Sequence, residues 1–268
     1  MARPGGRGMR IALGIAYRGQ AYSGWQSQPG GRTVQDNVEA ALSAFAAQPV
    51  QCLCAGRTDA GVHALNQVVH IDTPLDRTEQ SWVRGTNRFL PGDIAVQWCR
   101  HVPPSFHARF QAAGRRYAYL LLDAPVRPAL EAGLVGWSFR RLDGDAMRDA
   151  AAALVGERDF SAFRSAECQA LSPVKHMREV AVERRGAYWR FDFDADAFLH
   201  HMIRNIVGSL VAVGSGAQTV GWFGDVLAAR DRRLAAATFS ADGLYFVGPY
   251  YDPVHDIPDR TAAMDWLR

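Results

Sequence analysis

Lysine is almost absent from this sequence. Lys175 is the only lysine among 30 basic residues, so nearly every positively charged side chain is a guanidinium. Guanidinium groups are suited to two-point contacts with phosphate and to stacking on bases. A genome rich in arginine codons would produce the same bias, so composition alone does not decide between a genomic and a functional cause.

The chain also lacks the patterns that indicate a membrane protein, a secreted protein or a metal site. No run approaches the roughly 20 apolar residues that span a bilayer, and residues 1–8 lack the apolar core of a signal peptide. The four cysteines form no paired C-x-x-C motifs, so neither a disulfide framework nor a tetrahedral zinc site is indicated. We expect a cytoplasmic protein with no membrane association, no metal, and a short disordered basic tail at residues 1–8.

Residues 9–104 contain alternating strand and helix patterns. Large and small residues alternate from Arg10 to Tyr17, which is the period of a strand. Thr33 can cap a helix that ends before Pro49 and has an apolar face of Val34, Val38, Leu42 and Phe45. Strands at 50–55, 67–72 and 94–101 and a helix at 79–89 complete the order βαββαβ.

Residues 105–268 repeat this order, with strands expected at 115–122, 179–184, 188–194 and 244–250 and helices at 145–155 and 197–213. The clearest strand alternates Trp189, Phe191 and Phe193 with charged residues, after a turn at Arg185-Gly186. Two βαββαβ units predict an α+β fold of two ferredoxin-like halves, joined in one extended mixed sheet with helices on one face. Such a sheet leaves a face open for a ligand such as RNA, although many unrelated activities share this architecture.

One loop between two predicted strands, residues 54–64, carries a single carboxylate, Asp59. Gly56 and Gly61 let the backbone turn sharply or approach a ligand, and Arg57 favours the ionised form of the neighbouring acid. An ionised and positioned carboxylate is a competent nucleophile. A simple turn in which Asp59 caps its own backbone would use the same residue types.

The segment Gly56-Arg57-Thr58-Asp59-Ala60-Gly61-Val62-His63 resembles the signature of the tRNA pseudouridine synthase A family. Further blocks agree with the family in the same order: Tyr22-Ser23-Gly24-Trp25-Gln26, Thr33-Val34-Gln35, Phe106-His107-Ala108-Arg109-Phe110, Arg115-Arg116-Tyr117, Asp159-Phe160-Ser161-Ala162-Phe163-Arg164, Phe198-Leu199-His200-His201-Met202-Ile203-Arg204-Asn205 and Gly243-Leu244-Tyr245. The resemblance runs from about Ile11 to Tyr251. It is specific because many independent blocks occur in the expected sequence.

This resemblance implies the pseudouridine synthase fold and makes Asp59 the catalytic nucleophile. In the family, the matching aspartate attacks the target uridine, the glycosidic bond breaks, the base turns, and a carbon–carbon bond forms to the same ribose. No cofactor is required. The implied substrate is uridine in the anticodon stem-loop of tRNA, at positions 38, 39 and 40, and the implied assembly is a homodimer with the tRNA lying across both subunits.

Four further residues receive substrate-binding roles from the resemblance. Tyr117 matches the tyrosine that packs against the target base, and Arg204 matches the arginine that keeps the nucleophile ionised and oriented. Arg57 resembles the residue that fills or holds open the space left by the flipped nucleotide, and Leu244 resembles an apolar residue of the uridine pocket. Without the resemblance, Tyr117 would be an ordinary strand residue and Arg204 a solvated helix cation.

Histidines and arginines near these blocks are further candidates. Because neighbouring residues point to different faces of a helix, we interpret His63, His200 and His201 as structural or RNA-contacting rather than as metal ligands. The arginines around the blocks are candidate phosphate contacts: Arg109, Arg115, Arg116, Arg164 and Arg178. The apolar run from Ile206 to Val213 could supply a dimer interface.

Three other functions are compatible with parts of this pattern. A sibling synthase with another RNA target would carry the same motif, because target choice depends on RNA shape and on dispersed phosphate contacts. A non-catalytic RNA-binding protein could use the same sheet and arginines, but Asp59, Tyr117 and Arg204 argue against it. A nucleoside hydrolase would need a second acid or a metal site, and the motif supplies neither.

Overall fold

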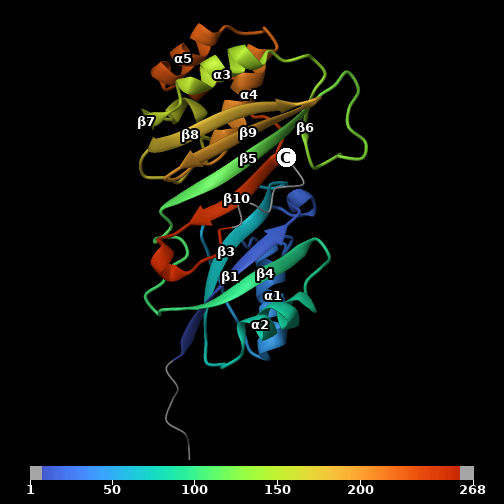
Figure 1. The fold of residues 1–268 in the computed structure, drawn as a ribbon, viewed down its shortest axis with the longest axis vertical. Coiled ribbons are helices and arrows are strands. Elements are labelled where there is room, and N and C mark those ends of the chain that lie inside the picture. Colours follow the sequence, from blue (N-terminus) through green and yellow to red (C-terminus); the bar gives the residue numbers. More distant parts are fainter. Residues whose placement is uncertain (1–7, 260–268) are drawn as a thin grey trace, which may run out of the picture. The chain divides into compact units, whose positions relative to one another are not determined.

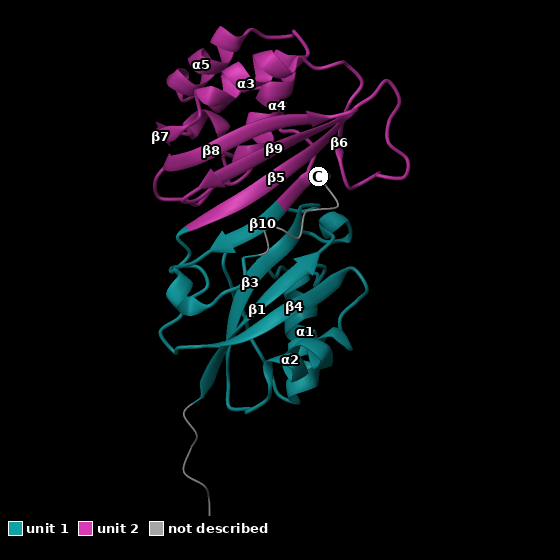
Figure 2. Ribbon diagram, in the orientation of Figure 1, with its two compact units in different colours: residues 1–113, 246–268 teal, residues 114–245 magenta. Residues whose placement is uncertain are grey.

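The structure is a computed structural model that describes residues 8–259. The basic tail predicted at residues 1–8 therefore lies outside the described residues, except for Gly8. The chain divides into two compact units (Figure 2). Unit 1 contains the described residues up to Ala113 and those from Phe246 onward, and unit 2 contains Gly114–Tyr245.

Unit 1 begins with the predicted βαββαβ order. Its elements are β1 (Met9–Tyr17), the 3-10 helix η1 (Gly19–Ala21), α1 (Val34–Ala46), β2 (Leu53–Cys54), β3 (His63–Thr73), α2 (Glu79–Asn87) and β4 (Ile94–Val102). The greater part of β10 (Leu244–Tyr250) and η4 (Pro253–His255) also belong to this unit. β1 lies between β3 and β4 and is antiparallel to both, while α1 packs against α2 and α2 packs against β4 (Figure 1).

The patterns read from the sequence account for the core of unit 1. The large residues of the β1 alternation are fully buried, namely Ile11, Leu13 and Ile15. Thr33 caps α1 as predicted, because its hydroxyl accepts a hydrogen bond from the Asp36 N–H. The predicted apolar face of α1 is buried at Val34, Val38 and Leu42, and Phe45 packs edge-on against Trp82.

β2 is shorter than the strand predicted at 50–55. The Val50 N–H donates to Ser43 Oγ at 2.9 Å, and the Cys52 N–H donates to Glu39 Oε1 at 2.9 Å. Because side chains of α1 take these backbone groups, pairing with β3 is confined to Leu53 and Cys54.

Unit 2 contains more elements than the sequence predicts. They are β5 (Gly114–Asp123), β6 (Gly136–Ser138), α3 (Gly144–Ala152), β7 (Gly156–Asp159), η2 (Ser161–Phe163), β8 (Val174–Arg185), β9 (Tyr188–Ala195), α4 (Met202–Gly214), α5 (Val220–Ala229) and η3 (Arg232–Leu234). Of these, β6, β7, α5 and the 3-10 helices are not among the predicted elements. α3 packs against α4, α5 and β8, so the helices of unit 2 gather on one side of its strands (Figure 1).

The β8–β9 hairpin forms as predicted. Trp189, Phe191 and Phe193 are all at most 2% exposed. Gly186 turns the chain with a φ of 60°, in the left-handed region that suits glycine. This aromatic row gives the strands of unit 2 a buried face. On that face, the ring of Tyr119 of β5 packs edge-on against the ring of Phe191.

α4 begins later than the helix predicted at 197–213. The Met202 N–H bonds to the Leu199 carbonyl in a turn, and His201 has a left-handed backbone with φ 61°. A right-handed helix does not continue through such a residue, so Arg204 lies in the first turn of α4. The run from Ile206 to Val213 is largely core of unit 2, with Ile206, Leu210 and Val213 at most 3% exposed. Its suggested role as a dimer interface is therefore wrong.

Within unit 1 the strand order is β4-β1-β3-β10, with β2 beside β3, and within unit 2 it is β5-β9-β8-β7, with β6 beside β5. The sheet is mixed, since β5 and β6 are parallel and β5 and β9 are antiparallel. The predicted α+β class with a mixed sheet is confirmed. Among residues 8–259, no helix combines the length and apolar character needed to cross a membrane.

Candidate active site

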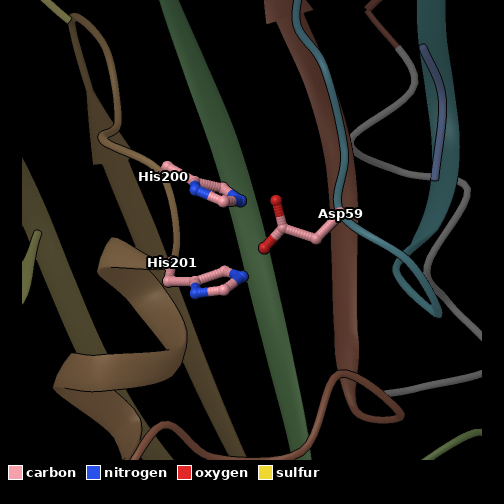
Figure 3. Close-up of side chains that lie close together, drawn as sticks. All are labelled: Asp59, His200 and His201. Carbon is pink, nitrogen blue, oxygen red and sulfur yellow. The ribbon is translucent and has the colours of Figure 1, made fainter. Parts of the chain in front are cut away.

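Asp59 lies in the loop between β2 and β3, where the sequence predicts it (Figure 3). Its side chain is partly exposed. The turn that follows is closed by the main chain, because the Val62 N–H donates to the Asp59 carbonyl at 3.2 Å and Gly61 adopts φ 82°. The carboxylate is therefore not needed to close this turn, which weakens the interpretation of Asp59 as a mere backbone cap.

Thr58, the residue before Asp59, is held from two sides. Its hydroxyl lies 2.8 Å from the Tyr17 hydroxyl at the end of β1, and its carbonyl accepts from the Trp25 N–H at 3.0 Å. Thr58 is 6% exposed and Tyr17 is 4% exposed. Burial raises the pKa of Tyr17, so its phenol stays protonated. The core of unit 1 thus fixes the backbone from which the Asp59 side chain projects.

Gly24 explains why a glycine occurs in the block from Tyr22 to Gln26. Its φ is 90°, and a Cβ built on it would lie 2.7 Å from the Thr58 carbonyl oxygen. Any side chain here would push against the backbone of the Asp59 loop. The two blocks, far apart in the sequence, therefore form one structural unit around Asp59.

The remaining polar groups of this loop are mostly structural. His63 is buried, and its Nδ1 accepts from the Gly19 N–H at 3.1 Å, in agreement with a structural role. Burial raises the pKa of Cys54 to about 11, partly opposed by the charge of Arg57, so the Cys54 thiol is protonated at neutral pH. Arg57 itself is exposed.

In unit 2, Tyr117 lies on β5 opposite Phe193 and is only partly buried. Its ring meets that of Phe198 at 76° with 5.1 Å between centroids, which fixes its orientation. Tyr119, two residues on, is fully buried and donates to the Ser240 carbonyl at 2.9 Å. Of the two tyrosines, Tyr117 is the more exposed.

Arg204 is anchored to the segment that precedes β10. Its Nε donates to the Phe239 carbonyl at 2.9 Å, and its own carbonyl accepts from the Phe239 N–H at 3.2 Å. Leu244 starts β10 and is 5% exposed. Both residues therefore have fixed positions within unit 2.

His200 and His201 do not point to different helix faces, as the sequence suggested. They precede α4, and the left-handed backbone of His201 brings the two rings together at 4.0 Å and 34° (Figure 3). Imidazoles are metal ligands, and the interpretation of this pair as structural or RNA-contacting stays a prediction. Within unit 2 the pair forms a small polar and aromatic surface.

The predicted phosphate-contacting arginines differ in their surroundings. Arg116 and Arg178 both bind the carboxylate of Asp194, at 3.3 and 3.1 Å. Arg115 donates to the Asp196 carbonyl, and Arg164 donates to the Cys168 and Ala170 carbonyls. These side chains therefore have structural partners. Arg109 is exposed on the connection between β4 and β5.

Nothing in the sequence marks Cys168, because it belongs to no paired cysteine motif. Its sulfur accepts from the His200 N–H at 3.4 Å. Burial opposes ionisation of this thiol, but backbone N–H groups of Ala170 and His200 together with the charge of Arg164 lower its pKa. Its nearness to the matched block at 198–205 is visible only in the fold.

Comparison with known proteins agrees with this arrangement. A family model described as tRNA pseudouridine synthase matches residues 14–111 and 150–252. The protein named tRNA pseudouridine synthase A of Methylibium petroleiphilum is 67% identical over 97% of this chain and 100% of its own. Its namesake in Polaromonas naphthalenivorans is 63% identical over 97% of this chain and 100% of its own.

Similarity to solved structures is weaker. A chain of an archaeal box H/ACA sRNP crystal structure aligns with 91% of this chain and 49% of its own, at 12% identity and a TM-score of 0.37. That score is too low to indicate a common fold. The sequence matches, by contrast, reach 63% and 67% identity over 97% of this chain, and the family model covers the segments of Asp59 and Arg204. The chain therefore belongs to the tRNA pseudouridine synthase family.

Proposed function

We propose that this protein converts uridine to pseudouridine in the anticodon stem-loop of tRNA, at positions 38, 39 and 40, with the Asp59 carboxylate as nucleophile. Family membership supports the reaction class. The observation that carries the assignment of Asp59 is its place in the family signature, on a loop whose backbone is fixed through Thr58. Such positioning is what a nucleophile needs, because reactive geometry lowers the entropic part of the barrier.

The reaction balances without a cofactor. Asp59 attacks the target uridine, the bond between ribose C1′ and uracil N1 breaks, and the base turns while held in the site. A bond then forms between C1′ and uracil C5, and the bond between Asp59 and the nucleoside breaks, which returns the free carboxylate. The proton on C5 leaves to solvent, and N1 takes up a proton. Retention of the base separates this isomerisation from hydrolysis, which releases free uracil.

Four other residues complete the proposal. Tyr117 packs against the target base, and Arg204 orients the nucleophile. Arg57 occupies or holds open the space of the flipped nucleotide, and Leu244 contributes to the apolar lining of the uridine pocket. The partly exposed ring of Tyr117 and the anchored guanidinium of Arg204 support these roles.

We further propose that the protein acts as a homodimer on tRNA in the cytoplasm. Its family membership supports the tRNA partner, and the free thiols of its four cysteines fit a reducing compartment. Light scattering after size-exclusion chromatography measures the mass directly. A monomeric mass with and without tRNA would rule out the homodimer.

Release of tritium from unmodified tRNA labelled at uracil C5 tests the reaction. The variant Asp59→Asn is nearly isosteric and removes the nucleophilic charge. Asp76→Asn, at an exposed position of unit 1, is the matched control. We expect release by the native protein and by D76N, and none by a folded D59N that still binds tRNA.

Other outcomes separate the alternatives. Release by D59N would show that Asp59 is not the nucleophile, although the enzyme class would stand. Binding without release on any tRNA would favour a non-catalytic RNA-binding protein, and free uracil would indicate a hydrolase. Mapping the modified uridines by reverse transcription would reveal a sibling synthase if they lie outside positions 38 to 40.

A further inference from the structure

An exposed aromatic pair lies on the connection between β4 and β5. Phe110 is 75% exposed, which is unusual for so large an apolar side chain. One side of its ring is covered by the His107 ring, with 4.2 Å between centroids and 31° between planes. Both residues belong to the block Phe106-His107-Ala108-Arg109-Phe110, to which the proposed reaction assigns no role.

The backbone holds this pair rigidly. His107 Nδ1 accepts from the N–H groups of Arg109 at 3.2 Å and Phe110 at 3.3 Å. The His107 N–H in turn donates to Gln111 Oε1 at 2.9 Å. These hydrogen bonds fix the His107 imidazole. Little conformational entropy of this side chain is therefore lost when a ligand stacks on the pair.

Residues adjacent to the pair belong to the core of unit 1. Phe106 and Ala108 are fully buried in a cluster with Trp98 of β4 and Val68 of β3. Beneath His107, the buried ring of His70 lies at 4.7 Å, and its Nδ1 accepts from the Ala108 N–H at 3.2 Å. Buried residues therefore fix the segment that carries Phe110, although the Phe110 ring itself is exposed.

Positive charge accompanies the ring. The Arg109 guanidinium carbon lies 5.8 Å from the Phe110 ring centroid. Burial, followed by the charges of Arg10 and Arg109, lowers the pKa of His107, so its imidazole is neutral at pH 7. An exposed uncharged aromatic ring beside a guanidinium has the features that proteins use to bind a nucleotide of single-stranded RNA.

This surface lies close to the loop of Asp59 within unit 1. Leu53 of β2 is the register partner of His70, on which His107 rests. The charge of Arg109 also acts on the Cys54 thiol, at the end of β2. From Cys54 the chain runs directly into the loop that carries Asp59, so the stack contacts, through His70, the same β2 segment from which this loop begins.

We propose that Phe110 and His107 form a stacking platform for one unpaired base of the tRNA substrate, with Arg109 beside the phosphate of that nucleotide. The platform rests on the proposed function and adds a contact outside the uridine pocket. A single open ring flanked by a cation fits one base and its phosphate. An interface with another protein would call for a wider apolar surface.

Three substitutions of Phe110 separate ring stacking from simple apolar contact. Phe110→Ala removes the ring, Phe110→Leu keeps apolar bulk without a π face, and Phe110→Tyr keeps the ring. Phe89→Ala deletes a phenylalanine that is 50% exposed elsewhere in unit 1 and serves as the matched control. Fluorescence anisotropy gives Kd for unmodified tRNA, tritium release gives KM and kcat, and circular dichroism verifies folding.

We expect F110A and F110L to raise Kd and KM about tenfold, with kcat within about twofold of the native value because the platform lies outside the reacting atoms. F110Y and F89A should bind as the native protein does. Equal Kd values for F110A and F89A would overturn the platform, and so would native affinity in F110L. Tritium release by the native protein and its loss in D59N test the reaction independently of the platform. A negative result for the platform therefore does not contradict the proposed function. If no tritium is released, Kd still decides the platform.

Discussion

The hydroxyl of Tyr17 lies 2.8 Å from the hydroxyl of Thr58, directly before Asp59. Tyr17 ends β1, the strand between β3 and β4, and its ring packs against that of Trp25 with 5.8 Å between centroids. Trp25 in turn donates its N–H to the Thr58 carbonyl. The position of Asp59 is thus linked to the centre of the unit 1 sheet.

Removal of the Tyr17 hydroxyl should loosen this link. Tyr17→Phe keeps the ring but leaves the buried Thr58 hydroxyl without its phenol partner, at a cost of about 1 to 3 kcal/mol in the free energy of unfolding. Activity should fall in the folded variant because the loop loses a constraint. Urea denaturation and tritium release measure both effects, and Tyr188→Phe, which deletes an exposed phenol, is the control. Unchanged kcat in Y17F would show that the constraint is dispensable.

Substitution of Gly24 should displace the Asp59 loop. Gly24→Ala places a methyl group 2.7 Å from the Thr58 carbonyl oxygen and imposes a positive φ on alanine, with about 1 to 3 kcal/mol of backbone strain. Gly30→Ala also has a positive φ, but nothing lies within 4 Å of its Cβ. Both variants should lose stability, while only G24A should lose most of its kcat. Equal kcat in the two variants would contradict a role of Gly24 in loop placement.

The ring of Tyr117, rather than its hydroxyl, should matter for substrate. Tyr117→Phe keeps the edge-on contact with Phe198 and should retain activity. Tyr117→Ala removes the surface on which the base packs and should lower kcat/KM by about tenfold to a hundredfold. Thermal melting should show similar Tm values for the two variants, since the ring is only partly buried. Equal activity of Y117A and Y117F would argue against packing on the base.

His70 should make unit 1 less stable in mild acid. Burial, followed by the charges of Arg10 and His107, lowers its pKa from 6.5 to about 4. Between these values the unfolded chain binds a proton that the folded protein does not, so stability falls as the pH drops through this window. From pH 7 to pH 5 the loss should be about 2 kcal/mol.

Urea denaturation at both pH values measures this loss. His70→Asn offers an oxygen in place of Nδ1 to the Ala108 N–H and does not titrate. Its unfolding free energy should therefore change less between pH 7 and pH 5 than that of the native protein. The same pH dependence in both proteins would assign the effect to other groups.

Periodic patterns predicted much of this fold. The alternation in β1 and the aromatic row of β9 are strong because one face of each strand is buried. The shortening of β2 was not predictable, since side chains of Glu39 and Ser43 on α1 take its backbone groups. α5 was missed because Gly221 and Gly224 weaken its helical pattern, although Thr219 caps it.

The candidate site shows the same division between local and long-range information. The signature around Asp59 is contiguous, so the sequence could mark it. The pairing of His200 with His201 depends on one left-handed backbone, and the stack of Phe110 on His107 depends on hydrogen bonds that the motif does not reveal. Local patterns identify the residues, whereas their orientation is set by the folded backbone.

The division of β10 has a consequence for the timing of protein synthesis. Leu244 and Tyr245 belong to unit 2, which is continuous from Gly114, whereas Phe246–Tyr250 belong to unit 1 and lie beside β3. A ribosome makes Asp59 early, but the unit that holds it lacks a strand until residue 250 has been added. Unit 2 can therefore fold during translation before unit 1 is complete. A nascent chain would then complete the unit that carries the Asp59 loop only near the end of its own synthesis.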